Sequence, residues 1–333
     1  MQLFKKLLAT TALATVGLCS HAQDITVLLP YSALYVFGDS LSDGGNNAAV
    51  IGLNASQPIT NTYVPTQPYG LGAYTNSRVW VNSFAGSLGL PAAAGPSLLG
   101  GGGGNYAYGG ARTATDGAGL PPSANTALNG FLASPLGVTS SALYVIAVGG
   151  NDVRDVLAAG AAPPLVASAA AAYANAVGNM VDALQARGAA HIIIWDAPNV
   201  GKAPAVLALG TATSIGATSI SSAFNAALTT RLTGETGVSV FDVFGTFNTI
   251  IGSPAAYGLT NVVDACGGVL GCDPSKYLFW DGIHPTSGGH ALVASAMLTL
   301  ALATAVPEPG SVLMMAAGLV LLVVVTRRRL PAR

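Results

Sequence analysis

Four short apolar runs recur along the chain, and each stops at residues that favour a turn. Segments rich in Ala, with apolar residues at helical spacing, follow the later runs. The runs are Ala33–Phe37, Ala142–Val148, Ile192–Trp195 and Val238–Val243, and the helical segments are Leu165–Gly188, Ser214–Thr233 and Gly288–Ala303. Buried strands that alternate with helices need crossover connections, and these cover both faces of a parallel sheet. The sequence therefore predicts an α/β fold with a mainly parallel central sheet between two layers of helices.

Polar residues whose side chains could take part in catalysis follow the first two strands. Ser40 comes just after the first strand and Asn151 just after the second, at the end of a parallel sheet where functional groups gather. Near the other end of the chain, Asp281 and His284 add a carboxylate and an imidazole. A hydroxyl, an imidazole and a carboxylate together make an alcohol nucleophilic near neutral pH. We expect these segments to meet in space.

Four motifs occur in a fixed order over nearly the whole body of the chain. They are Phe37–Asp43 (FGDSLSD), Asn105–Ala111 (NYAYGGA), Gly149–Asp152 (GGND) and Asp281–His284 (DGIH). In type and order they resemble the four conserved blocks of the SGNH/GDSL hydrolases. The resemblance implies a flavodoxin-like three-layer α/β/α sandwich. It also implies an esterase or lipase that needs neither a metal nor a cofactor.

The resemblance assigns a role to each residue that matches these blocks. Ser40 would be the nucleophile, and His284 would act as general base and then as general acid. Asp281, three residues before His284, would hold the imidazole in the required tautomer. The oxyanion donors would be the backbone N–H groups of Ser40 and Gly110 and the side-chain amide of Asn151. Glycine suits position 110 because the backbone must approach the substrate closely there.

Other polar residues near these motifs favour structural roles. Asp39 and Asp43 fit turn and helix-cap positions better than a calcium site shared with Asn46 and Asn47, because the order of an EF-hand loop is absent. His290, on the segment that follows the last motif, is expected to be a surface or packing residue rather than the base.

The first 22 residues have the features of a secretory signal. Lys5 and Lys6 precede an apolar stretch at 7–18, and the small residues of 20–22 predict cleavage before Gln23. Lipid attachment at Cys19 is an alternative.

The last 28 residues have the order of parts of a sorting signal. Val306–Pro309 precedes an apolar run at 311–326, and Arg327–Arg329 follows it. This arrangement resembles the PEP-CTERM signal of Gram-negative bacteria, which implies an exosortase-type protease as partner, transient membrane contact and delivery to the cell surface; a simple tail anchor is the alternative. The predicted organisation is thus signal peptide (1–22), hydrolase domain (23–305) and sorting signal (306–333).

The charged residues between the two end segments argue against one class of partner, and the two cysteines there favour a disulfide. Between the two end segments lie 7 basic and 13 acidic residues, which argues against nucleic acid as a partner. Cys266 and Cys272 are a local pair in an exported chain, which favours a disulfide. A zinc site is the alternative, but no histidine lies near the two thiols in sequence.

The region 48–140 shows little periodicity, and we expect its aromatic residues to cover the site and line part of the substrate cleft. These are Tyr63, Tyr69, Tyr74, Trp80, Tyr106 and Tyr108. Such a cleft suits an ester with an acyl chain or an aryl group. The function predicted is an exported serine esterase or lipase. The alternatives are a carbohydrate O-acetyl esterase acting on exopolysaccharide and a surface matrix protein that keeps the fold without activity.

Overall fold

A computed structural model describes residues 31–51, 70, 72–99, 103–118 and 121–305 of the chain. The predicted signal peptide, the predicted sorting signal, Tyr63 and Tyr69 lie outside these residues.

The centre of the fold is a parallel four-stranded sheet in the order β1-β2-β3-β4. Its strands are β1 (Ala33–Gly38), β2 (Ala142–Ala147), β3 (His191–Trp195) and β4 (Val238–Phe241). Beyond β1, the segment 104–108 runs alongside the sheet: the N–H of Val36 donates to the carbonyl of Gly104, and the N–H of Tyr106 donates to the carbonyl of Val36. The predicted parallel sheet is confirmed.

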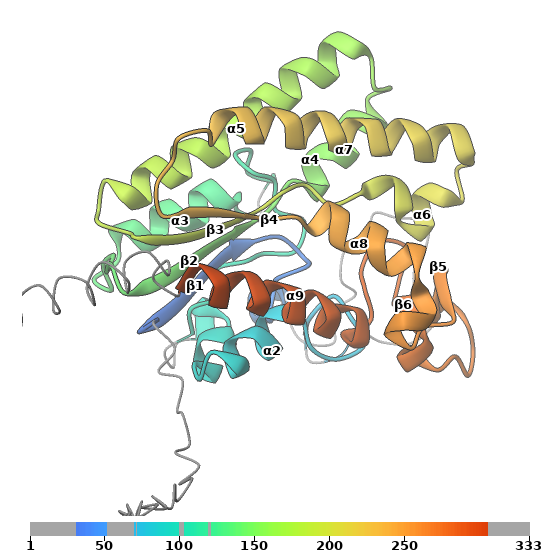
Figure 1. Cartoon of the computed structure of the whole chain (residues 1–333), viewed down its shortest axis with the longest axis horizontal. Helices are drawn as coiled ribbons and strands as arrows, with labels where there is room; N and C mark the ends of the chain where they lie inside the picture. Colours follow the sequence, from blue (N-terminus) through green and yellow to red (C-terminus); the bar gives the residue numbers. More distant parts are fainter. Residues whose placement is uncertain (1–30, 52–69, 71, 100–102, 119–120, 306–333) are drawn as a thin grey trace, which may run out of the picture.

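Helices cover both faces of this sheet (Figure 1). One face carries α3 (Ala124–Ala133), α4 (Gly150–Ala158), α5 (Pro163–Gln185) and α7 (Thr211–Arg231), and the other carries α2 (Trp80–Ser87), α8 (Val243–Gly252) and α9 (Ser287–Ala305). The side chains of successive strand residues point to opposite faces of the sheet: Ile194 packs against the layer of α3, α4, α5 and α7, and Ile193 packs against the layer of α2, α8 and α9. The predicted three-layer α/β/α sandwich is confirmed.

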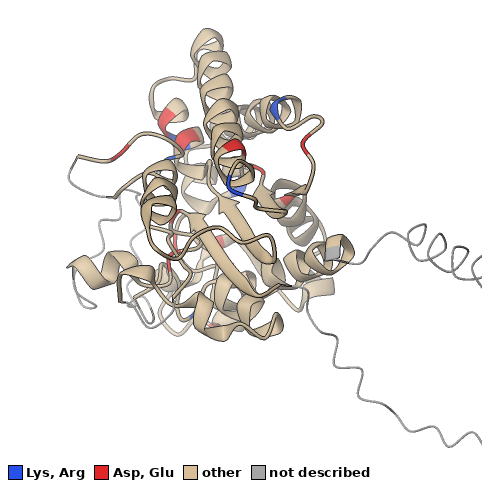
Figure 2. Ribbon diagram, turned by 90° about the vertical axis from the view of Figure 1, so that its left-hand side faces the viewer, with Lys and Arg blue, Asp and Glu red and all other residues tan. Residues whose placement is uncertain are grey.

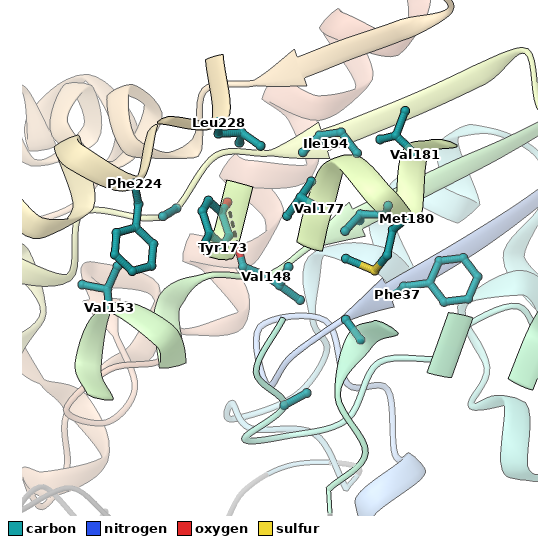
Figure 3. Packing of buried hydrophobic residues seen from close by; sticks show 14 of the residues in the cluster. Phe37, Val148, Val153, Tyr173, Val177, Met180, Val181, Ile194, Phe224 and Leu228 are labelled. Atoms are coloured by element: carbon teal, nitrogen blue, oxygen red, sulfur yellow. Dashed lines mark hydrogen bonds between the residues drawn. The ribbon is translucent and has the colours of Figure 1, made fainter. Parts of the chain in front are cut away.

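The layer formed by α5 and α7 shows why these Ala-rich segments are helical. Tyr173, Val177 and Met180 of α5 are buried against the sheet, and Phe224 of α7 packs on Tyr173 with ring centroids 5.1 Å apart (Figure 3). Burying one large apolar side chain stabilises a fold by about 1.5–3 kcal/mol. The hydroxyl of Tyr173 donates to the carbonyl of Val148, at the end of β2.

Several boundaries differ from the sequence prediction. The fourth strand ends at Phe241 rather than Val243, because the Asp242 side chain accepts the N–H of Gly245 and starts α8. Short helices connect the main elements. They are α1 (Asn46–Ile51), α6 (Pro204–Leu207) and the 3₁₀ turns η1 (Pro91–Ala94), η2 (Ser97–Leu99), η3 (Val200–Lys202), η4 (Pro254–Tyr257), η5 (Cys266–Gly268) and η6 (Pro274–Lys276).

A small second sheet, which the sequence did not predict, leads into the last motif. It pairs β5 (Asn261–Ala265) with β6 (Tyr277–Phe279). Cys266 and Cys272, in the connection between the two strands, form the expected disulfide. The N–H of Gly267 donates to the carbonyl of Trp280, so this loop is tied directly to the residue before Asp281.

Candidate active site

Ser40 lies in a tight turn at the carboxyl end of β1. Asp39 organises this turn: its carboxylate accepts the N–H of Leu41, and its carbonyl accepts the N–H groups of Ser42 and Asp43. The turn raises Ser40 out of the sheet, at the edge where parallel strands present their functional groups. Its side chain lines a cleft, although the residue is only 7% exposed.

Asp281 and His284 lie in a second turn, just after β6. One carboxylate oxygen of Asp281 accepts the N–H of Ile283 at 2.8 Å and the N–H of His284 at 2.7 Å. The other oxygen lies 2.6 Å from Nδ1 of His284, whose Nε2 lies 2.7 Å from Oγ of Ser40. Residues 244 positions apart in sequence therefore form one continuous hydrogen-bonded chain.

This chain of hydrogen bonds is buried. Asp281 is fully inaccessible to solvent and His284 is 4% exposed. The ring of Tyr74 packs against the imidazole of His284, with centroids 5.3 Å apart and the two ring planes tilted by 34°. Exclusion of water strengthens the electrostatic coupling between the carboxylate and the imidazole.

His284 is the histidine that hydrogen-bonds to Ser40, and the other two histidines between residues 23 and 305 have other surroundings. His191 begins β3, at the opposite end of the sheet from Ser40. His290 is buried on α9, where burial, and then the charge of His284, lowers its pKa to about 3. It is therefore neutral near pH 7 and serves as a packing residue.

Asn151 lies in the first turn of α4, beside Ser40 in the cleft wall, and two hydrogen bonds fix the orientation of its amide. Its Nδ2 donates to the carbonyl of Ala111 at 2.9 Å, and its Oδ1 accepts from Arg154 at 3.3 Å. One Nδ2 hydrogen remains to donate elsewhere. The bond to Ala111 also joins Asn151 to the segment that holds Gly110. Gly110 has φ +81°, a left-handed conformation that a side chain would strain.

Asp43 has a structural role in the turn that precedes α1. Its two carboxylate oxygens accept backbone N–H groups from Gly45, Asn46, Asn47 and Gly109. The side-chain amides of Asn46 and Asn47 donate to carbonyls of the 105–109 segment. The side chains of Asp43, Asn46 and Asn47 thus hydrogen-bond the first motif to the second. Because these bonds occupy the carboxylate of Asp43, the three side chains are not arranged as a calcium site.

A cleft opens beside Ser40, and most of its wall is apolar. Its apolar residues include Leu41, Val200, Ala203, Phe247, Phe279 and Ile283. None of the described residues between 48 and 140 lines this cleft, so the expectation that they form part of its wall is wrong. Tyr74 of this region does cover the site as expected, because its ring packs on His284. Trp80 is buried on the face of the sheet that α2, α8 and α9 cover, where its ring packs against Trp195 and its Nε1 donates to Ser42.

Sequence reasoning missed three polar residues that line the cleft, namely Arg154, Asn199 and Lys202, and it gave Asp39, which also lines the cleft, a structural role only. Burial raises the pKa of Asp39 to about 6. Lys202 belongs to the segment that follows β3. The rule that functional groups collect after parallel strands, applied to this third strand, would have drawn attention to it.

Comparison with known proteins gives two family matches. The model of the GDSL-like Lipase/Acylhydrolase family matches residues 34–297, and that of the PEP-CTERM protein-sorting motif matches residues 305–329. The second match implies exosortase processing and export to the cell surface.

Individual proteins of several organisms are also similar. "Esterase EstA" of Pseudomonas aeruginosa is 32% identical over 89% of this chain, which spans about half of that protein's length. A "GDSL esterase/lipase" of Arabidopsis thaliana is 26% identical, over 89% of this chain and 96% of its own. Among solved structures, an extracellular lipase of Streptomyces rimosus is 20% identical with a TM-score of 0.43, covering 83% of this chain and 100% of that one.

Proposed function

The chain belongs to the GDSL-like lipase/acylhydrolase family, and from that premise we propose that it is an exported serine esterase. It hydrolyses carboxylic ester bonds through an acyl-Ser40 intermediate. The observation that carries this proposal is the buried hydrogen-bonded chain from Asp281 through His284 to Ser40.

In the acylation step, Oγ of Ser40 attacks the ester carbonyl while Nε2 of His284 takes the hydroxyl proton. Nδ1–H of His284 donates to Asp281 throughout, which keeps Nε2 free to accept. The imidazolium that forms is stabilised by the buried carboxylate, and it returns the proton to the leaving alcohol. Water then attacks the acyl-Ser40 ester with the same base, and the carboxylic acid is released.

The negative oxygen of each tetrahedral intermediate needs hydrogen-bond donors that are already in place. We assign this role to the backbone N–H groups of Ser40 and Gly110 and to the free Nδ2 hydrogen of Asn151. The bonds that orient Asn151 mean that no reorganisation is needed as charge develops. Loss of one such donor raises the barrier by about 3–4 kcal/mol in comparable sites.

The apolar wall of the cleft favours an acyl chain over an acetyl group on a glycan. A series of p-nitrophenyl esters tests this: we expect kcat/KM to rise as the acyl chain lengthens beyond acetyl, until the cleft is filled. Preference for acetylated sugars over every longer acyl ester would replace this substrate class with the O-acetyl esterase alternative.

Labelling with a fluorophosphonate probe tests the nucleophile itself. The probe is expected to modify the wild type and an exposed-serine control, Ser275→Ala, but not Ser40→Ala. His284→Ala should react far more slowly because the hydroxyl loses its base. Absence of labelling in a folded wild type would favour the inactive matrix protein.

The sorting motif implies export, and we propose the following roles for the segments of the chain. We assign residues 1–22 to a cleaved signal peptide and 23–305 to the exported hydrolase body. The segment 311–326 would hold the chain in the membrane until an exosortase-type protease acts on it.

A further inference from the structure

Two adjacent glycines carry the second motif past the candidate active site, and each is glycine for a different reason. At Gly109 an added Cβ would overlap the ring of Tyr74, which packs on His284. At Gly110 the limit is conformation, because φ is +81°. The peptide group between two glycines meets little steric resistance to rotation. Its direction must therefore be set by hydrogen bonds.

The direction of this peptide group decides where the N–H of Gly110 points. A peptide group is planar and trans, so the carbonyl of Gly109 and the N–H of Gly110 point in opposite directions within one plane. A side chain that binds the carbonyl therefore also aims the N–H. Among the described residues, no group accepts the N–H of Gly110, which leaves this donor for the oxyanion.

Asn47, on α1, is the side chain that binds this carbonyl. Its Nδ2 donates to the carbonyl of Gly109 at 2.9 Å and to the hydroxyl of Tyr74 at 2.7 Å. Because a carbonyl oxygen only accepts, it is the nitrogen of the Asn47 amide that must face Gly109. Asn47 is only 6% exposed, so water competes little for this bond.

The peptide groups that follow are held from the other side. Arg112 donates to the carbonyl of Gly110 at 3.1 Å, and Asn151 donates to the carbonyl of Ala111 at 2.9 Å. These bonds fix the two peptide groups after Gly110, next to an amide in the cleft wall. The bond from Asn47 fixes the peptide group before it, which is the one that carries the proposed oxyanion donor.

We propose that Asn47 is a positioning residue of the esterase, which aims the N–H of Gly110 at the oxyanion. The inference rests on the proposed esterase function and adds a residue outside its triad and its oxyanion hole. Asn47 holds the peptide group and, by binding its carbonyl, also polarises the N–H at the opposite side of that group. The benefit falls on the tetrahedral intermediates, because negative charge on the substrate oxygen develops there and not in the bound ester.

The neighbouring Asn46 supplies a matched control. It is also buried on α1, and its amide also donates twice to the second motif, at the carbonyls of Asn105 and Ala107. Neither carbonyl shares a peptide group with a proposed oxyanion donor. Charged residues are sparse over this protein (Figure 2), so two neutral amides supply much of the link between α1 and the second motif. Comparing the two asparagines separates joining the motifs from aiming Gly110.

Asn47→Leu removes the donor at similar side-chain size. We expect kcat for p-nitrophenyl butyrate to fall about 30- to 100-fold, the size of a misplaced donor, with KM within about twofold. The Ki of a butyl trifluoromethyl ketone, which Ser40 converts to a tetrahedral adduct, should rise by the same factor as kcat/KM falls. Loss of folded protein alone would lower kcat without changing this Ki. Asn46→Leu should lower the midpoint of urea unfolding as Asn47→Leu does, but change kcat and Ki by less than about threefold.

Asn47→Asp keeps the shape of the side chain without its donor, and it gives the same test if the leucine variant does not fold. A folded variant of either kind with kcat and Ki within about threefold of the wild type would overturn the proposal. Equal losses in Asn46→Leu would also overturn it, since Asn47 would then only join the motifs. In both cases, hydrolysis by the wild type that depends on Ser40 leaves the esterase function standing. A folded wild type that hydrolyses no p-nitrophenyl ester refutes the proposed function, and the positioning role with it.

Discussion

Asp281→Asn changes one atom of the buried hydrogen-bonded chain, and its effect follows from the geometry. The oxygen that accepts the N–H groups of Ile283 and His284 cannot be exchanged for an NH₂ group without setting donors against each other. The amide NH₂ must therefore replace the oxygen that lies 2.6 Å from Nδ1 of His284. It donates to Nδ1, so the imidazole carries its proton on Nε2, facing Ser40.

In that tautomer His284 cannot accept the proton of Ser40. Reversing the amide would leave two buried N–H groups unsatisfied, at about 1–3 kcal/mol each, and the imidazolium would still lack its carboxylate. We expect kcat to fall about 10⁴-fold, as a tautomer defect does in comparable triads. This corresponds to about 5 kcal/mol in the activation barrier.

The assay is steady-state hydrolysis of p-nitrophenyl butyrate, with urea unfolding to verify that the variant keeps its fold. Asp273→Asn, which alters an exposed cap of η6, serves as the control and should keep full activity. An Asn followed by Gly282 deamidates readily, so intact mass must show that no Asp has been regenerated. A mass-verified variant within about tenfold of the wild type would refute the tautomer argument.

Two further predictions concern stability. Gly149→Ala should lower the free energy of unfolding by about 2–3 kcal/mol, because Gly149 has φ +118° and an added Cβ would lie 2.9 Å from the ring of Tyr173. Gly234→Ala, at φ +88° in open space, is the control and should lower it by about 1 kcal/mol. Equal losses for the two variants in urea unfolding would contradict the packing argument. Asp196→Asn should flatten the dependence of Tm on pH. Burial raises the pKa of Asp196 to about 7 in the folded state, so the stability that this group contributes is present below about pH 4 and is lost as the pH rises through 7. The pKa of Asp39, raised to about 6, contributes with the same sign, so some slope should remain in the variant; an unchanged slope would exclude Asp196 as a source.

The parallel sheet could be predicted because its strands are buried on both faces. Runs such as Ile192–Trp195 are then apolar at every position, and turn residues mark where they stop. Element ends were harder to place, as at Asp242, where a side-chain cap rather than hydropathy ends β4 and begins α8. The short pairing of β5 with β6 left no signal, because two of the five residues of Asn261–Ala265 are polar and the strand is exposed along part of its length.

Residue types and their order along the chain were enough to single out Ser40, Asn151, Asp281 and His284. Ser40, Asp281 and His284 belong to local turns whose hydrogen bonds are made within a few residues, so the form of these turns is encoded locally. Asn151 lies in the first turn of α4, and its amide is oriented in part by Ala111, 40 residues away. The sequence by itself thus determined the chemical groups and their order along the chain.

Only the tertiary structure decided which side chains surround those groups. The cleft wall comes from η3, α8, β6 and the loop after it, segments whose proximity depends on how the helices pack over the sheet. The same packing buries Trp80 in the core and leaves Arg154 and Lys202 lining the cleft beside Ser40. Such neighbours are set by long-range burial of apolar surface, which is non-directional and leaves no local pattern in the sequence.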